Sequence, residues 1–293
     1  MLRLVVLGSR ATHPSKNNLV SCYGIKQGGT YLLEACEGVQ QQLMKYGLSY
    51  LNCKAIFISH EHSDHYLGIF GLTQTMNLYG RTEELKVFAP KELCDFLKKI
   101  FSNNMLKPKF AIKFIPLRQG LIFKNEFLQV TAFKAKHDHD SYGLVVSTPS
   151  YRKFDVKACK KLGIKGLDFK RLEQNGFITK NGKKTSFKSV SYLQEGKKIV
   201  YTGDSMPCPA IVKNSKNAEI LIHDSTFLDK DKDLARERRH STNKQALDAA
   251  EKAGAKQLIL THFSNRYENV EKLRLSSRKT LVLLAQEGLE LSL

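Results

Sequence analysis

The length, composition and charge of the chain already exclude several classes of protein. With 293 residues, 42% of them hydrophobic and 26% charged, the chain needs no disulfides or structural metal to build a core and is too apolar to be disordered. Its 47 lysine and arginine residues outnumber the 28 aspartate and glutamate residues by 19, which favours a nucleic acid or an anionic surface, rather than a neutral metabolite, as the partner.

Short apolar runs typical of strands alternate with helical patterns through the first 150 residues. This alternation is that of an α/β fold, in which helices cover β-sheets. The buried strand over 55–59 is the most informative element, because it leads directly into a cluster of histidines. We predict strands over 2–7, 19–25, 31–34, 55–59, 85–89, 110–115 and 128–133, and helices over 38–46, 68–79 and 92–101.

The composition changes between Tyr151 and Val190. This stretch holds twelve lysine or arginine residues against three acidic ones, a net charge of +9, and several glycines interrupt it. We interpret residues 151–190 as a protruding basic arm inserted into a single domain that spans 1–293. On charge alone, a solvated surface helix with a hairpin is the alternative interpretation.

The α/β pattern resumes after the basic segment. A helix and a strand are expected to finish the chain, and the sequence contains no internal repeat or low-complexity tract. We predict strands over 198–202, 219–222 and 257–261, and a helix over 243–252 that has Ser241 or Thr242 as its N-cap and ends at Gly254.

Signals for export and for membrane insertion are weak. No apolar run approaches the roughly 18 residues that span a bilayer, and the N-terminal run 2–7 ends at Gly8, too early for a signal peptide. The six cysteines form no Cys-x-x-Cys pair, so we expect reduced structural thiols. The sequence therefore predicts a cytoplasmic protein that does not associate with a membrane.

The strongest chemical signal is the run from His60 to His65, which follows a predicted strand. It contains three imidazoles and the carboxylate of Asp64 within six residues, and packing does not explain such crowding in a turn. His60 and His62 can face one metal ion while Asp64 and His65 face a second, since one short turn presents successive side chains to two adjacent points.

Further ligands are expected where other predicted strands end, because a rigid strand fixes the position of a side chain. His137, Asp204 and His262 each follow such a strand, although a lone histidine there is more often a surface residue. His139, two residues later, is a rival for the position of His137, but we expect His139 to face solvent instead. The predicted ligands are His60, His62 and His137 for one metal, Asp64, His65 and His262 for the other, and Asp204 as a bridge.

Taken together, these motifs resemble the ribonuclease Z family, the tRNA 3′-processing endonucleases of the metallo-β-lactamase fold. The resemblance spans nearly the whole chain, and the basic segment falls where that family carries its tRNA-binding arm. It implies a four-layer αββα sandwich. The motifs are Leu7-Gly8-Ser9, Pro14-Ser15-Lys16, Glu34 to Gln40, His60 to His65 with Gly68, His137 with Tyr142-Gly143, Thr202-Gly203-Asp204, Ile222 to Thr226, His240-Ser241-Thr242 and Leu260 to Ser264 with Arg266-Tyr267.

The resemblance implies a catalytic mechanism and assigns residues to it. Two zinc ions, or manganese in their place, would activate a water whose proton passes to Asp64. His240, oriented by Asp224, would protonate the leaving 3′-oxygen. The family usually has Asp at position 34 and Glu at position 224, where this chain has Glu34 and Asp224. The shorter Asp224 would need a closer approach or a water to reach its partner.

The resemblance also implies the substrate and the oligomeric state. Precursor tRNA would be bound by the arm of one subunit and cut by the other subunit of a homodimer. Two rival hypotheses keep the metal ligands: a small-molecule phosphodiesterase or sulfatase, and an RNA-binding metalloprotein without activity. The candidate substrate-binding residues are Lys16, Arg152, Lys153, Lys165, Lys170, Arg171 and Arg266.

Overall fold

The computed structural model describes residues 1–137, 140–180 and 182–293. Within these residues the chain divides into two compact units. The main unit comprises Met1–Ser147 and Lys197–Leu293, and the inserted unit comprises Thr148–Gly196. No helix in the described ranges is long and apolar enough to cross a membrane.

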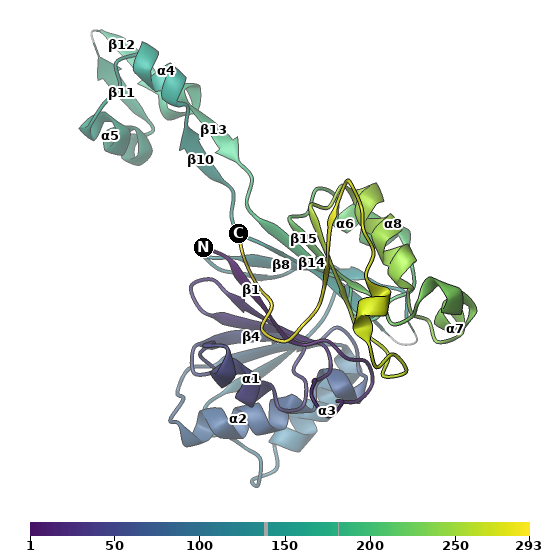
Figure 1. Cartoon of the computed structure of the whole chain (residues 1–293). Helices are drawn as coiled ribbons and strands as arrows, with labels where there is room; N and C mark the ends of the chain where they lie inside the picture. Colours follow the sequence, from purple (N-terminus) through teal and green to yellow (C-terminus); the bar gives the residue numbers. More distant parts are fainter. Residues whose placement is uncertain (138–139, 181) are drawn as a thin grey trace. The chain divides into compact units, whose positions relative to one another are not determined.

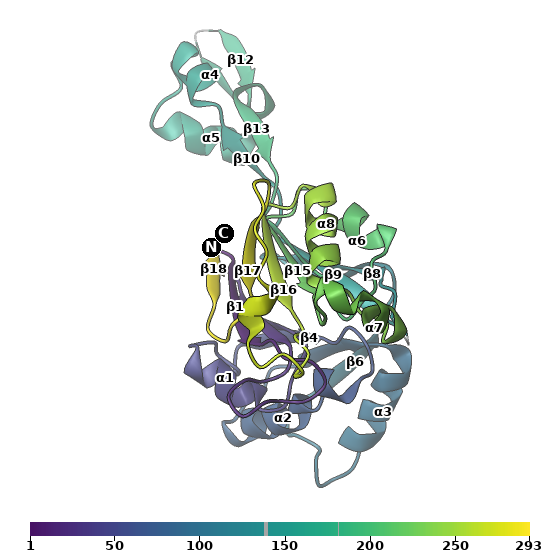
Figure 2. The same cartoon turned by 45° about the vertical axis from the view of Figure 1, so that its right-hand side comes forward.

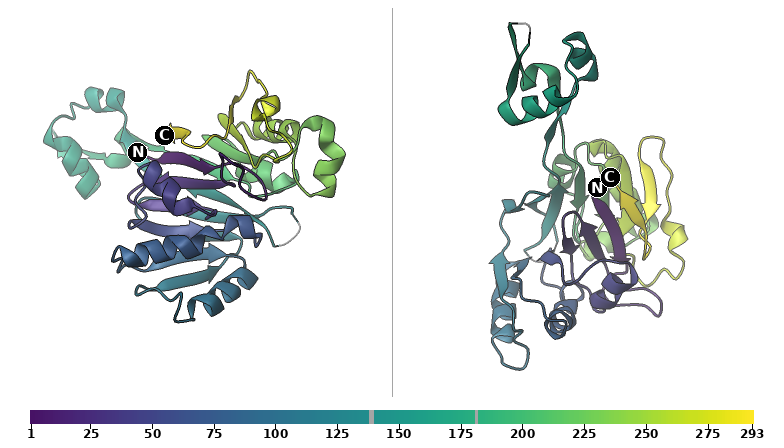
Figure 3. Two further views of the ribbon diagram at one scale, coloured as in Figure 1. Left: turned by 60° about the horizontal axis from the view of Figure 1, so that its bottom comes forward. Right: turned by 90° about the vertical axis from the view of Figure 1, so that its left-hand side faces the viewer.

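The first β-sheet of the main unit joins the two ends of the chain. In order across the sheet, its strands are β18 (Glu290–Ser292), β1 (Arg3–Gly8), β2 (Cys22–Lys26), β3 (Thr30–Leu33), β4 (Cys53–Phe57), β5 (Leu85–Ala89) and β6 (Ile112–Pro116). The pairs from β18 to β3 are antiparallel, and those from β3 to β6 are parallel. Because β1 pairs with β18, the two termini lie side by side (Figure 3).

The second sheet of the main unit has a parallel half and an antiparallel half. Its order is β17 (Leu281–Leu284), β16 (Gln257–Thr261), β15 (Ile220–Asp224), β14 (Lys198–Tyr201), β9 (Tyr142–Ser147), β8 (Gln129–Lys134) and β7 (Gly120–Lys124). The pairs from β17 to β14 are parallel, so the carboxyl ends of these strands lie at one edge (Figure 2). The pairs from β14 to β7 are antiparallel.

Helices cover the outer face of each sheet. The main helices are α1 (Val39–Lys45), α2 (Gly68–Leu78), α3 (Lys91–Phe101), α6 (Pro209–Asn214), α7 (Lys232–Glu237) and α8 (Asn243–Ala253). Figure 1 shows α1, α2 and α3 on one side of the main unit and α6 and α8 on the other, with the sheets between them. This is the four-layer αββα sandwich that the resemblance predicts.

Apolar side chains fill the spaces between these layers. One cluster joins both sheets and α8, and includes Tyr23 of β2, Tyr201 of β14 and Ile259 of β16. A second cluster packs the first sheet against α1, α2 and α3. Strands β15 and β16 are buried along nearly their whole length, which explains why their central residues, Ile220–Ile222 and Leu258–Leu260, are apolar without alternation.

The sequence predicts the central elements better than the peripheral ones. The strands over 85–89 and 257–261 have the predicted bounds, and Thr242 is the N-cap of α8, with a capping box to Gln245. The prediction missed β7 and β9, and also the short helices α6 and α7. The predicted C-terminal helix was wrong. That part of the chain forms β17, β18 and a single 3₁₀ turn, Val270–Leu273.

The inserted unit has a small core of its own. It contains α4 (Val156–Lys161), α5 (Leu167–Asn175), the paired strands β10 (Tyr151–Phe154) and β13 (Ser191–Gln194), and the paired strands β11 (Phe177–Lys180) and β12 (Lys183–Ser186). Buried Cys159, Ile164, Leu172, Ile178 and Val190 pack together inside it. The unit is thus a folded insertion, a few residues wider at each end than the predicted segment 151–190.

The turn that carries the histidine cluster is fixed to the first sheet by close backbone packing. The Ala35 N–H donates to the carbonyl of His65, and the Gly68 N–H donates to the carbonyl of Ala35. At the start of α2, a Cβ on Gly68 would lie 1.8 Å from the carbonyl oxygen of Cys36. Only glycine therefore permits this approach.

We predict that Gly68→Ala lowers the free energy of unfolding by about 2 kcal/mol or more, because rigid backbone must move. Gly71→Ala in the same helix is the matched control, since its Cβ would meet only the flexible side chain of Gln40. The control should change stability by no more than about 0.5 kcal/mol. Denaturant unfolding followed by circular dichroism measures both variants, and equal losses would contradict the steric explanation.

Candidate metal centre

The predicted metal ligands come together where strands of both sheets end. The turn His60 to His65 follows β4 of the first sheet, and Ser63–His65 forms a single 3₁₀ turn. His137, Asp204 and His262 follow β8, β14 and β16 of the second sheet. The seven residues fall into two groups, each with its donor atoms within 4.8 Å of one another, namely His60, His62, His137 and Asp204, and Asp64, His65 and His262.

Asp204 lies between the two groups. Its Oδ2 is 3.1 Å from Nε2 of His262, 3.5 Å from Nε2 of His65 and 3.6 Å from Nε2 of His60. Asp64 belongs to the second group, with its Oδ2 3.5 Å from Nε2 of His65. One carboxylate can thus reach both groups, as a bridging ligand must.

Several buried polar atoms in this cluster have no hydrogen-bond partner. They are Nδ1 and Nε2 of His65, Nε2 of His137, Nε2 of His262 and Oδ1 of Asp204. Unpaired buried polar atoms are costly, and native proteins rarely leave several of them together. Imidazole nitrogens and carboxylate oxygens that converge in this way are the donors that divalent cations use, so the residues fit a metal centre.

The ring nitrogens that face away from the cluster are held by neighbouring groups. Nδ1 of His60 is 2.9 Å from Oγ of Ser59, and Nδ1 of His137 is 2.9 Å from the carbonyl oxygen of Arg239. Nδ1 of His65 makes no hydrogen bond, but it lies 3.4 Å from Oε1 of Glu34, close enough for an ionic contact. These contacts orient the rings and direct each Nε2 toward the cluster.

Burial and neighbouring charges set the protonation of the ligands. Burial lowers the pKa of His60 well below its usual value, and it also lowers the pKa of His62 and of His262. Burial alone would raise the pKa of Asp204, but the nearby histidines, with His262 foremost, hold it well below the ordinary range. Burial would also lower the pKa of His65, but the carboxylates of Asp64, Asp204 and Glu34 raise it well above its usual value. Because neutral imidazoles and an ionised carboxylate are the forms that bind a metal, His65 would have to release its proton on metal binding.

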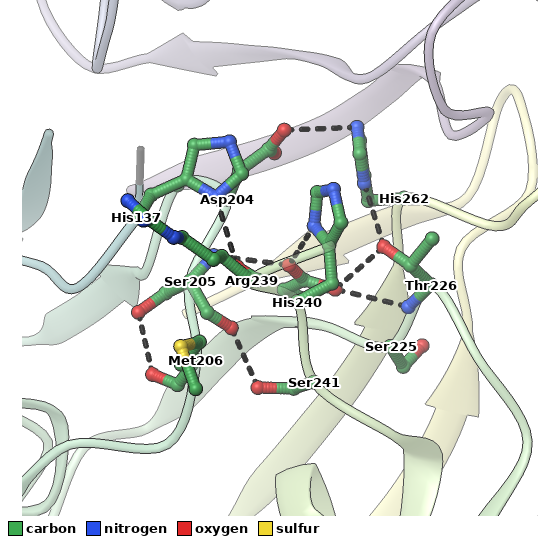
Figure 4. Close-up of polar contacts among 12 residues, drawn as sticks. His137, Asp204, Ser205, Met206, Ser225, Thr226, Arg239, His240, Ser241 and His262 are labelled. Carbon is green, nitrogen blue, oxygen red and sulfur yellow. Dashed lines mark hydrogen bonds and ion pairs between the residues drawn. The ribbon is translucent and has the colours of Figure 1, made fainter. Parts of the chain in front are cut away.

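His240 lies beside His137, Asp204 and His262 at the edge of the cluster (Figure 4), and it pairs directly with Asp224. Its Nδ1 lies 2.7 Å from Oδ2 of Asp224, and its ring centroid lies 4.8 Å from that of His137 and 5.1 Å from that of His262. The closer approach that the shorter Asp224 requires is therefore achieved without a water. Burial would lower the pKa of His240, but the Asp224 carboxylate raises it to about 9.

Thr226 connects this pair to the predicted metal ligands, a role that the sequence alone did not predict. Its hydroxyl donates to Oδ1 of Asp224 at 2.7 Å. The hydroxyl oxygen is then left to accept from Nδ1 of His262 at 2.8 Å, a contact that Figure 4 shows. The backbone N–H groups of Ser205 and Thr226 also donate to Asp224. The signal for Thr226 in the sequence was its place at the end of the motif Ile222 to Thr226, two residues after Asp224.

The two candidate phosphate contacts on the main unit are exposed and lie on loops beside the cluster. Lys16 follows the loop in which the Thr12 N–H donates to Oδ2 of Asp64 at 3.1 Å. The guanidinium of Arg266 lies 5.7 Å from the ring of Phe227, which is itself 6.2 Å from the ring of His240.

The candidate contacts on the inserted unit differ in their freedom. Lys153, Lys165, Lys170 and Arg171 are exposed. Arg152 is half-buried, and its guanidinium donates to Oγ and the carbonyl of Ser191 and to the carbonyl of Lys188. Since these bonds already hold Arg152, its role in the structure is to tie β10 to the end of the unit.

Two of the remaining histidines, His223 and His13, lie apart from this chemistry. His223 is buried, and its Nδ1 contacts the carbonyl oxygen of Asp224, whereas His13 is exposed on a loop. The rival ligand His139 lies outside the described residues. Each of the six cysteines lies in the described ranges and is a free thiol.

Comparison with known proteins identifies the family. The chain is 34% identical to the ribonuclease Z of Ignicoccus hospitalis over 92% of this chain and 90% of that protein. It is 37% identical to the ribonuclease Z of Archaeoglobus fulgidus, over 91% of this chain and 89% of the relative. The chain belongs to the ribonuclease Z family. The family described as "Beta-lactamase superfamily domain" matches residues 152–263, and the one described as "Anti-Pycsar protein Apyc1" matches residues 2–163.

Solved structures agree with membership of the ribonuclease Z family. The short form of human tRNase Z superposes with a TM-score of 0.72 at 26% identity. The superposition covers 99% of this chain and 98% of the human protein. A diphosphatase of the PhnP family has a TM-score of 0.68 at 16% identity, with 100% of this chain and 98% of that one covered, and shares the fold alone. The metallo-β-lactamase fold expected from the resemblance is thus confirmed.

We predict that Asp224→Asn lowers the pKa of His240 from about 9 to its ordinary value of 6.5 or below, because the amide cannot offset burial of the imidazolium. The raised pKa stabilises the fold fully below pH 6.5, and this contribution disappears as the pH rises through about 9. The variant should therefore lose more stability at pH 6 than at pH 9.5.

Histidine NMR titration and denaturant unfolding of the metal-free protein measure these changes. Metal-free protein is needed because bound cations would repel the imidazolium. The control is Asp233→Asn, which alters an exposed carboxylate on α7 and should leave both measurements unchanged. A pKa for His240 that is the same in the natural protein and in Asp224→Asn would refute the pairing.

Proposed function

We propose that the chain is the metal-dependent endoribonuclease that removes the 3′ trailer from precursor tRNA, leaving a 3′-hydroxyl on the tRNA and a 5′-phosphate on the trailer. The observation that carries the proposal is Asp204, whose Oδ2 lies among histidines of both ligand groups beside the His240–Asp224 pair. Full-length identity to several proteins named ribonuclease Z supports it. Residues from both the first and the second half of the chain are needed for this arrangement.

Two divalent cations would fit the ligand set. His60, His62 and His137 would hold one, Asp64, His65 and His262 the other, and Asp204 would contact both. The many imidazole donors favour zinc, with manganese as the alternative. When bound, such a pair of cations lowers the pKa of a water and neutralises charge on the phosphoryl oxygens.

Asp64 and His240 would move the protons. Asp64 keeps a carboxylate oxygen within 4.0 Å of His65 and His262, and would accept the proton of the attacking water. In the metal-free protein the Asp224 carboxylate raises the pKa of His240 to about 9, and the same carboxylate would favour the protonated ring that donates to the leaving 3′-oxygen. Asp224 keeps the imidazolium charged and turns its Nε2 away from the Asp224 carboxylate.

Exposed cations would bind the tRNA. On the inserted unit these are Lys153, Lys165, Lys170 and Arg171, while Lys16 and Arg266 would contact phosphates near the cut. RNA helices are recognised largely by shape and phosphate contacts, which such side chains provide. We further propose a homodimer, in which one subunit grips the tRNA and the other cuts it, and a cytoplasmic location, where precursor tRNA would be met.

The two rival functions share the ligands and differ in substrate. A small-molecule phosphodiesterase or sulfatase would have no use for a folded insertion with a net charge of +9 over 151–190. An RNA-binding protein without activity would not need His240 beside the cluster. The charged insertion and the His240–Asp224 pair therefore favour the endoribonuclease.

We expect the purified protein with zinc or manganese to cut a tRNA precursor directly after the discriminator nucleotide. Mapping the product ends by sequencing, with the 3′-hydroxyl tested by ligation, checks both the position and the chemistry. Activity on small esters alone would support the first rival function, and binding of the precursor without cleavage would support the second.

His240→Ala should lower the turnover number by about 10²–10⁴-fold, because the leaving oxygen loses its proton donor. Metal content should stay near two ions per chain by elemental analysis, since His240 is not among the seven predicted ligands. Loss of metal together with activity would instead place His240 among the ligands.

The inserted unit can be removed without disturbing the sheet around it. Ser147 of β9 pairs with Lys198 of β14, so replacing 148–197 by Asn-Gly would close an ordinary two-residue hairpin. We expect this variant to bind precursor tRNA more weakly and with a shallower salt dependence. Hydrolysis of a small phosphodiester should continue, and equal loss of both properties would contradict a substrate-binding role for the unit.

A further inference from the structure

A pocket of about 280 Å³ opens beside the predicted metal ligand His62. It lies between the turn that carries the histidine cluster and the first half of α3. The proposed mechanism leaves this pocket without a role. Its walls are Glu61, His62, Tyr66, Glu92, Leu93 and Phe96.

An aromatic pair forms one wall of the pocket. The rings of Tyr66 and Phe96 lie 6.2 Å apart, edge to face at 68°. Helix α3 buries Leu93 and Leu97 against the first sheet, whereas 45% of Phe96 stays exposed on the outer face of the same helix. A single exposed phenylalanine is unremarkable, but this one borders a cavity that also contains a metal ligand.

The charge of the pocket excludes phosphate as its occupant. The exposed carboxylate of Glu92 lines it and would repel a phosphodiester, although the protein as a whole carries a charge of +19. Carboxylates instead accept hydrogen bonds from the amino groups of cytosine, adenine and guanine. Aromatic faces stack on any nucleobase. The walls are therefore suited to the base of a nucleotide and not to its backbone.

We propose that this pocket receives the nucleobase next to the scissile phosphate, with Phe96 as its stacking surface, Tyr66 at its edge and Glu92 as the acceptor for its amino group. The inference rests on the proposed function and adds a specificity-determining contact to it. The base belongs either to the discriminator nucleotide or to the first trailer nucleotide, and substrates that lack one base distinguish the two. Uracil binds least well, because it has no amino group to donate to the Glu92 carboxylate. Its N3–H lies between two carbonyl oxygens that the carboxylate would repel.

The test is the rate of cleavage of a tRNA precursor by the full-length, metal-loaded protein. Phe96→Ala should lower kcat/KM by about 10-fold, a typical loss when one base loses its stacking partner, while Phe96→Tyr should cleave at nearly the natural rate. The matched control is Tyr79→Ala, which removes an exposed ring, 65% exposed, from the edge-to-face pair with Tyr50. That control should cleave like the natural protein.

Abasic substrates identify the occupant of the pocket. Of two precursors, one abasic at the discriminator position and one at the first trailer position, the natural protein should cleave one about 10-fold more slowly than the intact precursor. Phe96→Ala should cleave that abasic precursor no more slowly than the natural protein does, because the stacking contact is already lost. At that position the natural protein should disfavour uracil, and Glu92→Gln should reduce the preference. Metal content by elemental analysis should be the same in all variants.

Several results would overturn the proposal. The first is a kcat/KM for Phe96→Ala within twofold of the natural value. The second is that each abasic substrate slows Phe96→Ala by the same factor as it slows the natural protein, so that the two losses are independent. The third is that Phe96→Tyr loses as much activity as Phe96→Ala. Failure of the natural protein to cut any precursor would instead refute the proposed function, so the two failures are distinguishable.

Discussion

A single carboxylate oxygen organises the site. Oδ2 of Asp204 lies within 3.6 Å of imidazole nitrogens from His60, His65 and His262, which come from both sheets. A buried anion is unfavourable unless positive charge surrounds it, and buried imidazoles without partners are unfavourable as well. The two layers of the sandwich therefore meet at a point whose groups require a cation to balance them.

His240, the candidate proton donor, lies within 4.8 Å of donor atoms of Asp204 and His262 and is also joined to this cluster by hydrogen bonds. A continuous hydrogen-bonded path runs from His262 through the hydroxyl of Thr226 to Asp224 and on to His240. Each partner fixes the orientation of the next, since a hydroxyl that donates to Asp224 has to accept from His262. In a ribonuclease Z family member this path would keep the acid aligned with the ligands, and both would respond to any movement of the loop after β15.

The insertion lies at a point in the chain where it does not disturb the strands around the candidate site. It interrupts the chain between β9 and β14, whose pairing is complete on its own and belongs to the main unit. The inserted unit closes around its own apolar core, so its basic surface can vary without repacking the strands that carry the ligands. Under the proposed function, substrate binding and chemistry would be carried by different parts of one chain.

The sequence by itself determined the types and positions of the seven candidate ligands, because core packing does not require histidines and aspartates directly after predicted strands, whereas a metal centre does. It also determined strands such as 85–89 and 257–261, which are mostly apolar and are flanked by polar residues or proline. Half-exposed β7 and the short helix α6 carry no clear periodicity, so local patterns could not reveal them.

Only the tertiary structure decided how distant residues meet. The direct contact between Asp224 and His240, the bridging hydroxyl of Thr226 and the pocket beside Phe96 all depend on distances between segments far apart in the chain. Such distances arise from the stacking of the two sheets and from the packing of α3 against the first sheet. No pattern within one segment specifies them.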